Sequence, residues 1–327
     1  MHRQLAADRA RVARAMLRAC NLCAHRCGAD RTSGPAGVCK CDAQARLFSS
    51  RVDWAGEQEL VPTLVFNLSG CNMACDYCIT GTQSQDGCAG EPLDIAHVNT
   101  RFSPIREDIA SFAIEGGEPT VHLPGALEIA SIVPQSIPLV WKTNGYASIE
   151  ALELLEEVVD VFLPDYKFGN DACATRIAKT PNYTAAIQQN LLWARDHLPH
   201  TIVRHLLLPG HLDCCCIPML KWLKQRVPQI ELSLVTGFMP LHRARRHAEL
   251  GGMVSTEEAA CALEEARARN IRLAPWSMET RSKDYDGPPG RIWIGRDGRI
   301  CVNFASAGVI SCLKRLAPEI DIQFKDI

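Results

Sequence analysis

The chain has 327 residues, a net charge of −2 with histidine counted as neutral, 47% hydrophobic residues and 22% charged residues. Because there is no basic excess, no broad electrostatic field would attract a polyanion, and we expect no nucleic-acid partner. No apolar run approaches the roughly 20 residues that cross a bilayer, and the first residues lack the basic-then-apolar order of a signal peptide. The sequence therefore predicts a cytoplasmic protein without a membrane partner, and its 16 cysteines favour thiolate-bound metal over disulfides.

Residues 1–19 alternate alanine with arginine and leucine, which predicts an amphipathic packing helix with its arginines toward solvent. Closely spaced cysteines then follow on glycine-rich turns, where small residues let several thiolates approach one metal site. This ligand set is compatible with zinc and with a second iron–sulfur cluster. The predicted ligands are Cys20, Cys23, Cys27 and Cys39, with Cys41 or His25 in reserve.

The central motif is Cys71-Asn-Met-Ala-Cys75-Asp-Tyr-Cys78, directly after an apolar run that ends at Leu68. Three thiolates on one loop can hold three irons of a four-iron cluster. The fourth iron would then be free to bind a small molecule, so this motif predicts chemistry as well as electron transfer.

Apolar strands alternate with helical stretches from residue 58 to residue 238, which predicts parallel βαβ units. The expected strands are Thr63–Leu68, Ile109–Ile114, Leu139–Lys142, Val159–Leu163, Ile202–Leu208 and Ile230–Val235. The expected helices are Leu127–Val133, Ser148–Val158, Asn182–His197 and Met219–Val227, and a capping box at Ser255 opens one more, up to Asn270.

Polar groups follow several of these strands, where the chemistry of α/β barrels gathers. The second strand ends in Glu115-Gly116-Gly117-Glu118-Pro119. The next three strands lead to Asn144, to the pair Asp165 and Lys167, and to Arg204. Asp165 and Lys167 also suit a surface ion pair. His205 should point away from Arg204 by strand alternation, and we interpret it as a packing histidine.

These motifs together resemble the radical S-adenosylmethionine (SAM) superfamily, in which an aromatic residue such as Tyr77 usually precedes the third cysteine and a Gly-Gly-Glu-Pro motif follows the next strand. The cysteine pattern of residues 20–27 and the Gly-x-x-Gly-x-Cys stretch ending at Cys39 resemble the subgroup of pyruvate formate-lyase activating enzymes, although Ala24 replaces its usual proline. The resemblance implies a partial (β/α)6 TIM-type barrel with an N-terminal cysteine-rich segment and a small C-terminal extension.

The resemblance also implies the roles of the site residues. Cys71, Cys75 and Cys78 would ligate a [4Fe-4S] cluster whose open iron binds SAM. The glycine-rich motif would meet the methionine ammonium, while Asp165 and Lys167 would bind the ribose hydroxyls and the carboxylate. Arg204 would meet the SAM carboxylate or a substrate anion. The implied cofactor-binding residues are Tyr77, Gly116, Gly117, Glu118, Asn144, Asp165, Lys167 and Arg204.

The implied activity is reductive cleavage of SAM to a 5′-deoxyadenosyl radical that abstracts hydrogen, with electrons from a flavodoxin- or ferredoxin-type reductant. The nearest resemblance implies activation of a glycyl radical enzyme. Modification of a small molecule or a peptide is the alternative substrate class, and a non-catalytic iron–sulfur or zinc protein is the alternative of another kind.

We expect three parts: residues 1–58, the barrel of residues 59–275, and an extension of residues 276–327 with a hairpin on the Asp297-Gly298 turn. Cys214, Cys215 and Cys216 are interpreted as small core residues, because successive side chains point in different directions; a hydrogen donor or an extra cluster ligand is the alternative. The basic run 241–247 suits a solvated face or a docking site for phosphate or an acidic partner. Cys301 and Cys312 are expected to pack without metal.

Overall fold

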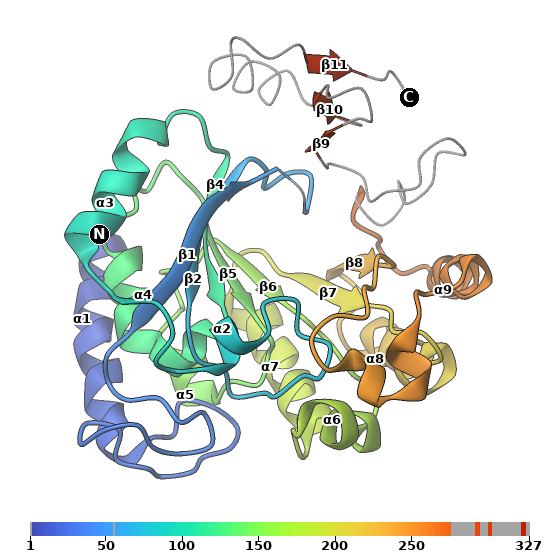
Figure 1. Ribbon diagram of the computed structural model, residues 1–327, viewed down its shortest axis with the longest axis horizontal. Coiled ribbons are helices and arrows are strands. Elements are labelled where there is room, and N and C mark those ends of the chain that lie inside the picture. Colours follow the sequence, from blue (N-terminus) through green and yellow to red (C-terminus); the bar gives the residue numbers. More distant parts are fainter. Residues whose placement is uncertain (1, 55, 276–291, 295–299, 303–321, 325–327) are drawn as a thin grey trace.

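The computed structural model describes residues 2–54, 56–275, 292–294, 300–302 and 322–324, and the statements below concern these residues (Figure 1). The expected Asp297-Gly298 turn, Cys312 and the side chain of Cys301 lie outside them.

A curved sheet forms the centre of the molecule, with the strand order β3-β1-β2-β4-β5-β6 (Figure 1). Its parallel part consists of β2 (Thr63–Leu68), β4 (Ser111–Gly116), β5 (Leu139–Thr143) and β6 (Val161–Pro164). Two further strands, β7 (Ile202–Leu206) and β8 (Glu231–Val235), pair in parallel. Isolated parallel bridges between Phe162 and Thr201 and between Asp165 and Arg204 continue the sheet from β6 to β7. All six expected strands are therefore confirmed, and the α/β fold has the strand arrangement of a partial barrel.

The N-terminal edge of the sheet was not expected from the sequence. The long strand β1 (Arg46–Asp53) lies antiparallel to β2, and the short β3 (Glu91–Pro92) pairs with β1. Every residue of β1 is at least partly exposed, whereas all of β2 is buried. A partly exposed strand lacks the continuous apolar run by which the buried strands can be recognised. The boundary expected at residue 58 remains a prediction.

Helices cover the outer face of the sheet, and most lie between successive strands (Figure 1). The expected helix from Ser148 is only one turn long, because the segment breaks into turns after Leu152; Ser148 caps it as expected. The helix opened by Ser255 carries the expected capping box. The α-helices are α1 (His2–Ala15), α2 (Thr82–Gln85), α3 (Ile95–Phe102), α4 (Leu123–Ala130), α5 (Ile149–Leu152), α6 (Asp171–Ala178), α7 (Tyr183–His197), α8 (Ile217–Arg226) and α9 (Thr256–Ala268).

Short helical turns complete the connections. They are η1 (Met16–Ala19), η2 (Ser103–Ile105), η3 (Pro119–His122), η5 (Ala244–Arg246) and η6 (Ala248–Gly251), together with the π-helical turn η4 (Leu212–Cys216).

Helix α1 is the packing helix that its alanine spacing predicted. Ala6, Ala10 and Ala13 are buried on one face, and Arg14 pairs with Glu128 of α4. Arg9 departs from the expectation of solvent-facing arginines, because its guanidinium donates to the carbonyl of Glu156.

Side chains alternate across the strands and give the barrel two different faces. Phe66 and Phe112 lie on the outer face and stack with their ring centroids 5.3 Å apart. Val65, Ala113 and Val140 belong instead to a small apolar cluster on the inner face. Further along the same strands, the inner positions carry polar or charged residues, at the end of the strands where the chemistry of α/β barrels gathers.

The described part of the C-terminal extension is a three-stranded sheet in the order β11-β10-β9. Strands β9 (Ile292–Ile294) and β10 (Ile300–Val302) pair antiparallel, as a hairpin requires, and β11 (Ile322–Phe324) adds a parallel partner that was not expected. None of the helices in the described part of the chain is long and apolar enough to span a membrane.

Candidate active site

The cysteine loop, residues 69–81, follows β2 and is held by the helix that follows β6. The amides of Ala74 and Asp76 donate to the carbonyls of Ala178 and Ile177 at the end of α6, both at 2.9 Å. These bonds fix the loop at a helix C-terminus, where carbonyls are free to accept.

Asp76, inside the motif, is a site residue that the sequence analysis missed. Its carboxylate lies 2.8 Å from Nε2 of His247 and 3.1 Å from Nε of Arg243. Part of the basic run 241–247 is thus neither a solvated face nor a free docking site, because two of its residues clamp the cysteine loop. The position of Asp76 between two cysteines is the only sequence signal for this role.

Hydrogen-bond donors surround the motif sulfurs. The amide of Met73 donates to Sγ of Cys71 at 3.4 Å, and the sulfur of Cys78 lies 3.2 Å from the hydroxyl of Ser84. Burial raises the pKa of Cys75 to about 12. Donors and low exposure fit a metal cluster, which supplies the positive charge that buried thiolates need.

The two glycines of the Gly-Gly-Glu-Pro motif bring β4 against the cysteine loop. Gly116 has φ 137°, and a Cβ there would overlap the backbone of Leu68. A Cβ on Gly117 would overlap the carbonyl of Gly70. Glycine is therefore required here by a close approach between two segments of the chain, and the expected contact of this motif with the ligand stays a prediction.

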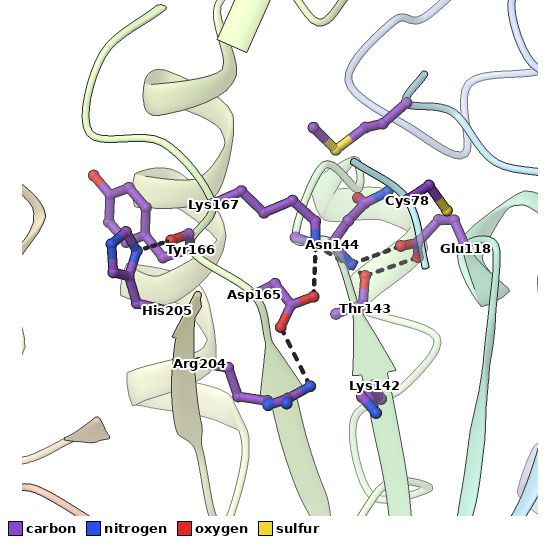
Figure 2. Close-up of polar contacts among 12 residues, drawn as sticks. Cys78, Glu118, Lys142, Thr143, Asn144, Asp165, Tyr166, Lys167, Arg204 and His205 are labelled. Atoms are coloured by element: carbon purple, nitrogen blue, oxygen red, sulfur yellow. Dashed lines mark hydrogen bonds and ion pairs between the residues drawn. The ribbon is translucent and has the colours of Figure 1, made fainter. Parts of the chain in front are cut away.

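Glu118 ties the ends of β4 and β5 together (Figure 2). Its carboxylate accepts from the hydroxyl of Thr143 and the amide of Asn144, both at 2.7 Å, and from the amide and hydroxyl of Thr120. Burial raises the pKa of Glu118. A direct contact of this carboxylate with the cofactor stays a prediction.

Asn144 connects this network to the cysteine motif. Its side-chain amide lies 2.7 Å from Oδ1 of Asn72 and 3.7 Å from the sulfur of Cys71. Its own Oδ1 accepts from the amide of Tyr146 at 2.9 Å, which fixes the side-chain orientation. The predicted Asn144 therefore reaches the first cysteine of the motif.

The strand ends of β6 and β7 supply a group of three charges (Figure 2). Nζ of Lys167 lies 2.7 Å from Oδ2 of Asp165, and the guanidinium of Arg204 lies 3.6 Å from Oδ1. Burial disfavours the ionised carboxyl, but Lys167 and Arg204 outweigh it and lower the pKa of Asp165. These side chains are 19% to 25% exposed, so the group is not an ordinary surface ion pair.

Arg204 is also held by Glu57, whose Oε1 lies 2.9 Å from its Nε. Nearby, Glu115 pairs with Lys142 at 2.5 Å and with Arg51 at 3.0 Å. The sequence analysis did not assign Glu57, Glu115 or Lys142 to the site, because separate strand ends give no local signal of pairing.

The hydroxyl of Tyr183 is a further group that the sequence analysis missed. It donates to the carbonyls of Asp165 at 2.7 Å and Asn144 at 3.1 Å, and it accepts from the amide of Lys167 at 2.9 Å. One buried hydroxyl from α7 thus holds the ends of β5 and β6 in register.

Tyr77 and His205 lie in apolar surroundings. Tyr77 is buried, with its ring centroid 6.2 Å from that of Phe168 and 6.1 Å from that of Phe238. His205 is buried, with Nδ1 2.6 Å from the carbonyl of Tyr166, and its side chain points away from Arg204 as expected (Figure 2).

The N-terminal cysteine segment packs against the candidate site. Cys23 forms a β-bridge with Ala147, and Nε2 of His25 lies 2.8 Å from the carbonyl of Asn72 in the cysteine loop. Cys41 lies beside the loop, since a Cβ on Gly70 would overlap its sulfur. His25 is thus engaged as a contact between segments.

Among the described residues, no three of the motif sulfurs, and no three of the sulfurs of Cys20, Cys23, Cys27 and Cys39, all lie within 4.8 Å of one another, as ligands of one ion would. A four-iron cluster separates its cysteine ligands more widely, because each binds a different iron. Arg31 is buried beside this segment and donates to the carbonyls of Cys41, Val121 and Asp42, with its guanidinium 3.7 Å from the sulfur of Cys20.

A family model of the radical SAM superfamily matches residues 68–223, the segment that carries the cysteine loop and the strand ends described above. An uncharacterized protein of Methanocaldococcus jannaschii is 30% identical over 272 residues, which cover 80% of this chain and 78% of that protein. The chain belongs to the radical SAM superfamily.

Solved structures of other proteins align with part of the chain. A domain of pyruvate-formate lyase-activating enzyme from Bacteroides vulgatus aligns over 50% of this chain and 97% of its own, with 16% identity and a TM-score of 0.41. Streptococcus suis SuiB, bound to its precursor peptide SuiA, aligns over 62% of this chain with 9% identity and a TM-score of 0.48, and the aligned part is 45% of SuiB. Membership of the superfamily implies a [4Fe-4S] cluster and SAM, and the donor-rich cysteine loop fits that requirement.

Proposed function

We propose that this radical SAM enzyme holds its cluster on Cys71, Cys75 and Cys78 and binds SAM against the four strand ends. When bound, the reduced cluster and SAM supply a 5′-deoxyadenosyl radical that abstracts hydrogen from the substrate. The observation that carries the proposal is the junction at Asn144, whose side chain contacts Cys71 while its amide contacts Glu118. The cysteine loop, the glycine motif and the end of β5 are thereby joined by one set of contacts.

At this site, Lys167 and Asp165 would each contact a different polar part of SAM. An ammonium suits the methionine carboxylate, and a carboxylate suits two ribose hydroxyls. Arg204 lies on the other side of Asp165 from Lys167 and already pairs with Glu57 (Figure 2). It would orient Asp165 and keep it ionised, in place of the direct carboxylate contact expected from the sequence.

The proposed substrate is a backbone glycine of a partner glycyl radical enzyme, with a flavodoxin- or ferredoxin-type protein as the electron donor. The support is the N-terminal cysteine pattern, which the resemblance associates with activating enzymes. The contacts of Cys23 and His25 with the site make this segment part of the pocket surroundings. We further propose that Cys20, Cys23, Cys27 and Cys39 hold a second cluster, since no three of their sulfurs lie as close together as the ligands of one zinc ion would.

The first test is SAM cleavage by anaerobically reconstituted protein with dithionite, followed by chromatography and mass spectrometry. We expect 5′-deoxyadenosine from the wild type and none from Cys75→Ala. Cys88→Ala is the matched control, because Cys88 is exposed just beyond the loop, and it should retain product formation. Absence of product from fully loaded wild type would contradict the proposal and favour a non-catalytic metal protein.

The partner is tested separately by electron paramagnetic resonance. A glycyl radical enzyme encoded beside this protein should acquire a stable glycyl radical when mixed with it, SAM and reductant. Formation of 5′-deoxyadenosine without a protein radical would reject the activating role while leaving SAM cleavage intact, and a labelled screen of small molecules and peptides would follow.

A further inference from the structure

A group of side chains of the kinds that bind metals lies outside the cysteine motif, at α6 and the turn after β7. Cys173 comes from α6, and His211, Cys214 and Cys215 come from the loop and π-helical turn after β7. One ligand atom from each lies within 4.8 Å of all the others. Three of the four residues are buried. We propose that these four residues bind one tetrahedral zinc ion.

The distances fit a single ion. Sγ of Cys214 lies 3.8 Å from Sγ of Cys173 and 3.9 Å from Sγ of Cys215. Tetrahedral zinc with its usual bond lengths places two ligand sulfurs about 3.8 Å apart. Nδ1 of His211 lies 3.2 Å from the sulfur of Cys214 and 3.6 Å from that of Cys215. Sulfurs this close do not suit a four-iron cluster, in which each cysteine binds its own iron.

The π-helical turn explains how two successive cysteines face one site. On a helical turn, residues three and four positions apart share a face, so Cys214 and Cys215 are both neighbours of His211. The amides of Cys215 and Cys216 both donate to the carbonyl of His211 at 3.1 Å, which tightens this turn. The sequence analysis favoured core packing for all three cysteines; the structure places only Cys216 outside the group.

Residues around the group orient and support its ligands. The side-chain amide of Asn170 lies 3.2 Å from the sulfur of Cys173 and 3.6 Å from that of Cys215. Nε2 of His211 lies 3.7 Å from Oε1 of Glu249, so Nδ1 is the nitrogen that faces the sulfurs. Glu249 is in turn paired with Arg176 at 2.6 Å. A carboxylate behind a ligand histidine and amide donors to ligand sulfurs are typical of built metal sites.

The zinc ion would be structural and would act on the cysteine loop through α6. Four protein ligands leave no open position for a reactant. Cys173 lies near the start of α6, and the carbonyls at the end of this helix hold the amides of Ala74 and Asp76. The ion would therefore fix the helix that positions the cluster loop. The proposal of a zinc site does not depend on whether SAM is cleaved or on which substrate is used.

The test is zinc content per full-length chain, measured by mass spectrometry of the metal after purification with zinc in the medium. We expect Cys173→Ala and Cys214→Ala to contain one zinc ion fewer than the wild type. Cys216→Ala is the matched control from the same turn and should retain the wild-type content. Equal zinc content in all four proteins would overturn the proposal, whatever the N-terminal cysteines bind.

A second measurement uses only wild-type protein, so it does not depend on whether the variants fold. Wild-type protein is treated with a thiol alkylating reagent with and without a zinc chelator, and the peptides containing residues 173 and 214–215 are quantified. We expect alkylation of these thiols to rise severalfold with chelator, while exposed Cys261 reacts equally in both. Equal alkylation with and without chelator, or a Cys173–Cys214 disulfide in the untreated protein, would contradict a zinc site.

Discussion

The side-chain amide of Asn144 lies 3.7 Å from the sulfur of Cys71, at the point where the end of β5 meets the cysteine loop. Hydrogen bonds to cluster sulfurs raise the reduction potential, because they stabilise the more negative reduced state.

We therefore expect Asn144→Leu to lower the potential of the bound cluster, as measured by a redox titration followed by electron paramagnetic resonance. The backbone contact of Asn144 with Glu118 remains in this variant, so the loop should still assemble a cluster. Asn99→Leu, on α3, is the control. An unchanged potential in Asn144→Leu would show that this contact does not reach the cluster.

Gly117 should not tolerate a side chain. A Cβ there would overlap the carbonyl oxygens of Gly70 and Ser84, so the cysteine loop would have to move. We expect Gly117→Ala to lower the free energy of unfolding by about 1–3 kcal/mol and to reduce iron incorporation. Gly237→Ala is a matched control, since nothing lies within 4 Å of its added Cβ. Thermal unfolding and iron analysis measure both effects, and identical behaviour of the two variants would refute this reading.

The hydroxyl of Tyr183 joins two strand ends that we assign to SAM binding. Tyr183→Phe leaves the ring in place and removes the three contacts to Asn144, Asp165 and Lys167. Loss of a buried hydrogen-bonding group should cost about 1–3 kcal/mol of stability. The KM for SAM in the 5′-deoxyadenosine assay should rise, because the backbone that carries Asp165 and Lys167 is no longer fixed. Tyr146→Phe, whose hydroxyl contacts Pro181 instead, should leave this KM near the wild-type value.

The buried His205 should lower the free energy of unfolding in acid. Burial lowers the pKa of His205 from 6.5 to about 4. Above pH 6.5 the residue is neutral in both folded and unfolded protein, and it contributes no pH dependence. As the pH falls from about 6.5 to about 4, the unfolded state takes up a proton that the folded state does not. Stability should therefore fall by on the order of 3 kcal/mol across this window.

The measurement is urea unfolding between pH 7 and pH 4, in a Cys71→Ala, Cys75→Ala, Cys78→Ala background that removes the cluster from the comparison. His205→Gln cannot gain the proton and retains a donor for the carbonyl of Tyr166. It should show a shallower loss of stability over the same range. Parallel pH profiles for the two proteins would mean that other groups account for the acid sensitivity.

The buried parallel strands could be predicted from the sequence because each is a short apolar run between turn residues. All of β2 is buried, and the expected bounds Thr63–Leu68 match the structure. Strand β1 gave no such run, since each of its residues is at least partly exposed. Helix α6, which holds the cysteine loop, was also missed, because it is only eight residues long and mixes polar with small residues.

The predicted site residues are local motifs at strand ends, and a motif is visible in a single stretch of sequence. The residues that support them are distant along the chain. Glu57 meets Arg204, and Asp76 meets His247, only after the barrel has formed. The group of Cys173 with Cys214 and Cys215 was missed for the same reason. A second reason is that the sequence does not predict the π-helical turn that carries two of these cysteines.

The pairing of β1 with β2 has a practical consequence for work with shortened forms of the protein. Strand β1 lies between the cysteine-rich segment and the barrel, and it covers the hydrogen-bonding edge of β2 along Thr63–Leu68. Removing residues 1–58 would leave β2, a buried and mostly apolar strand, with an open edge, which is a template for association between molecules. Such a truncation should aggregate even when the rest of the barrel is intact, and a soluble minimal form has to begin before Arg46.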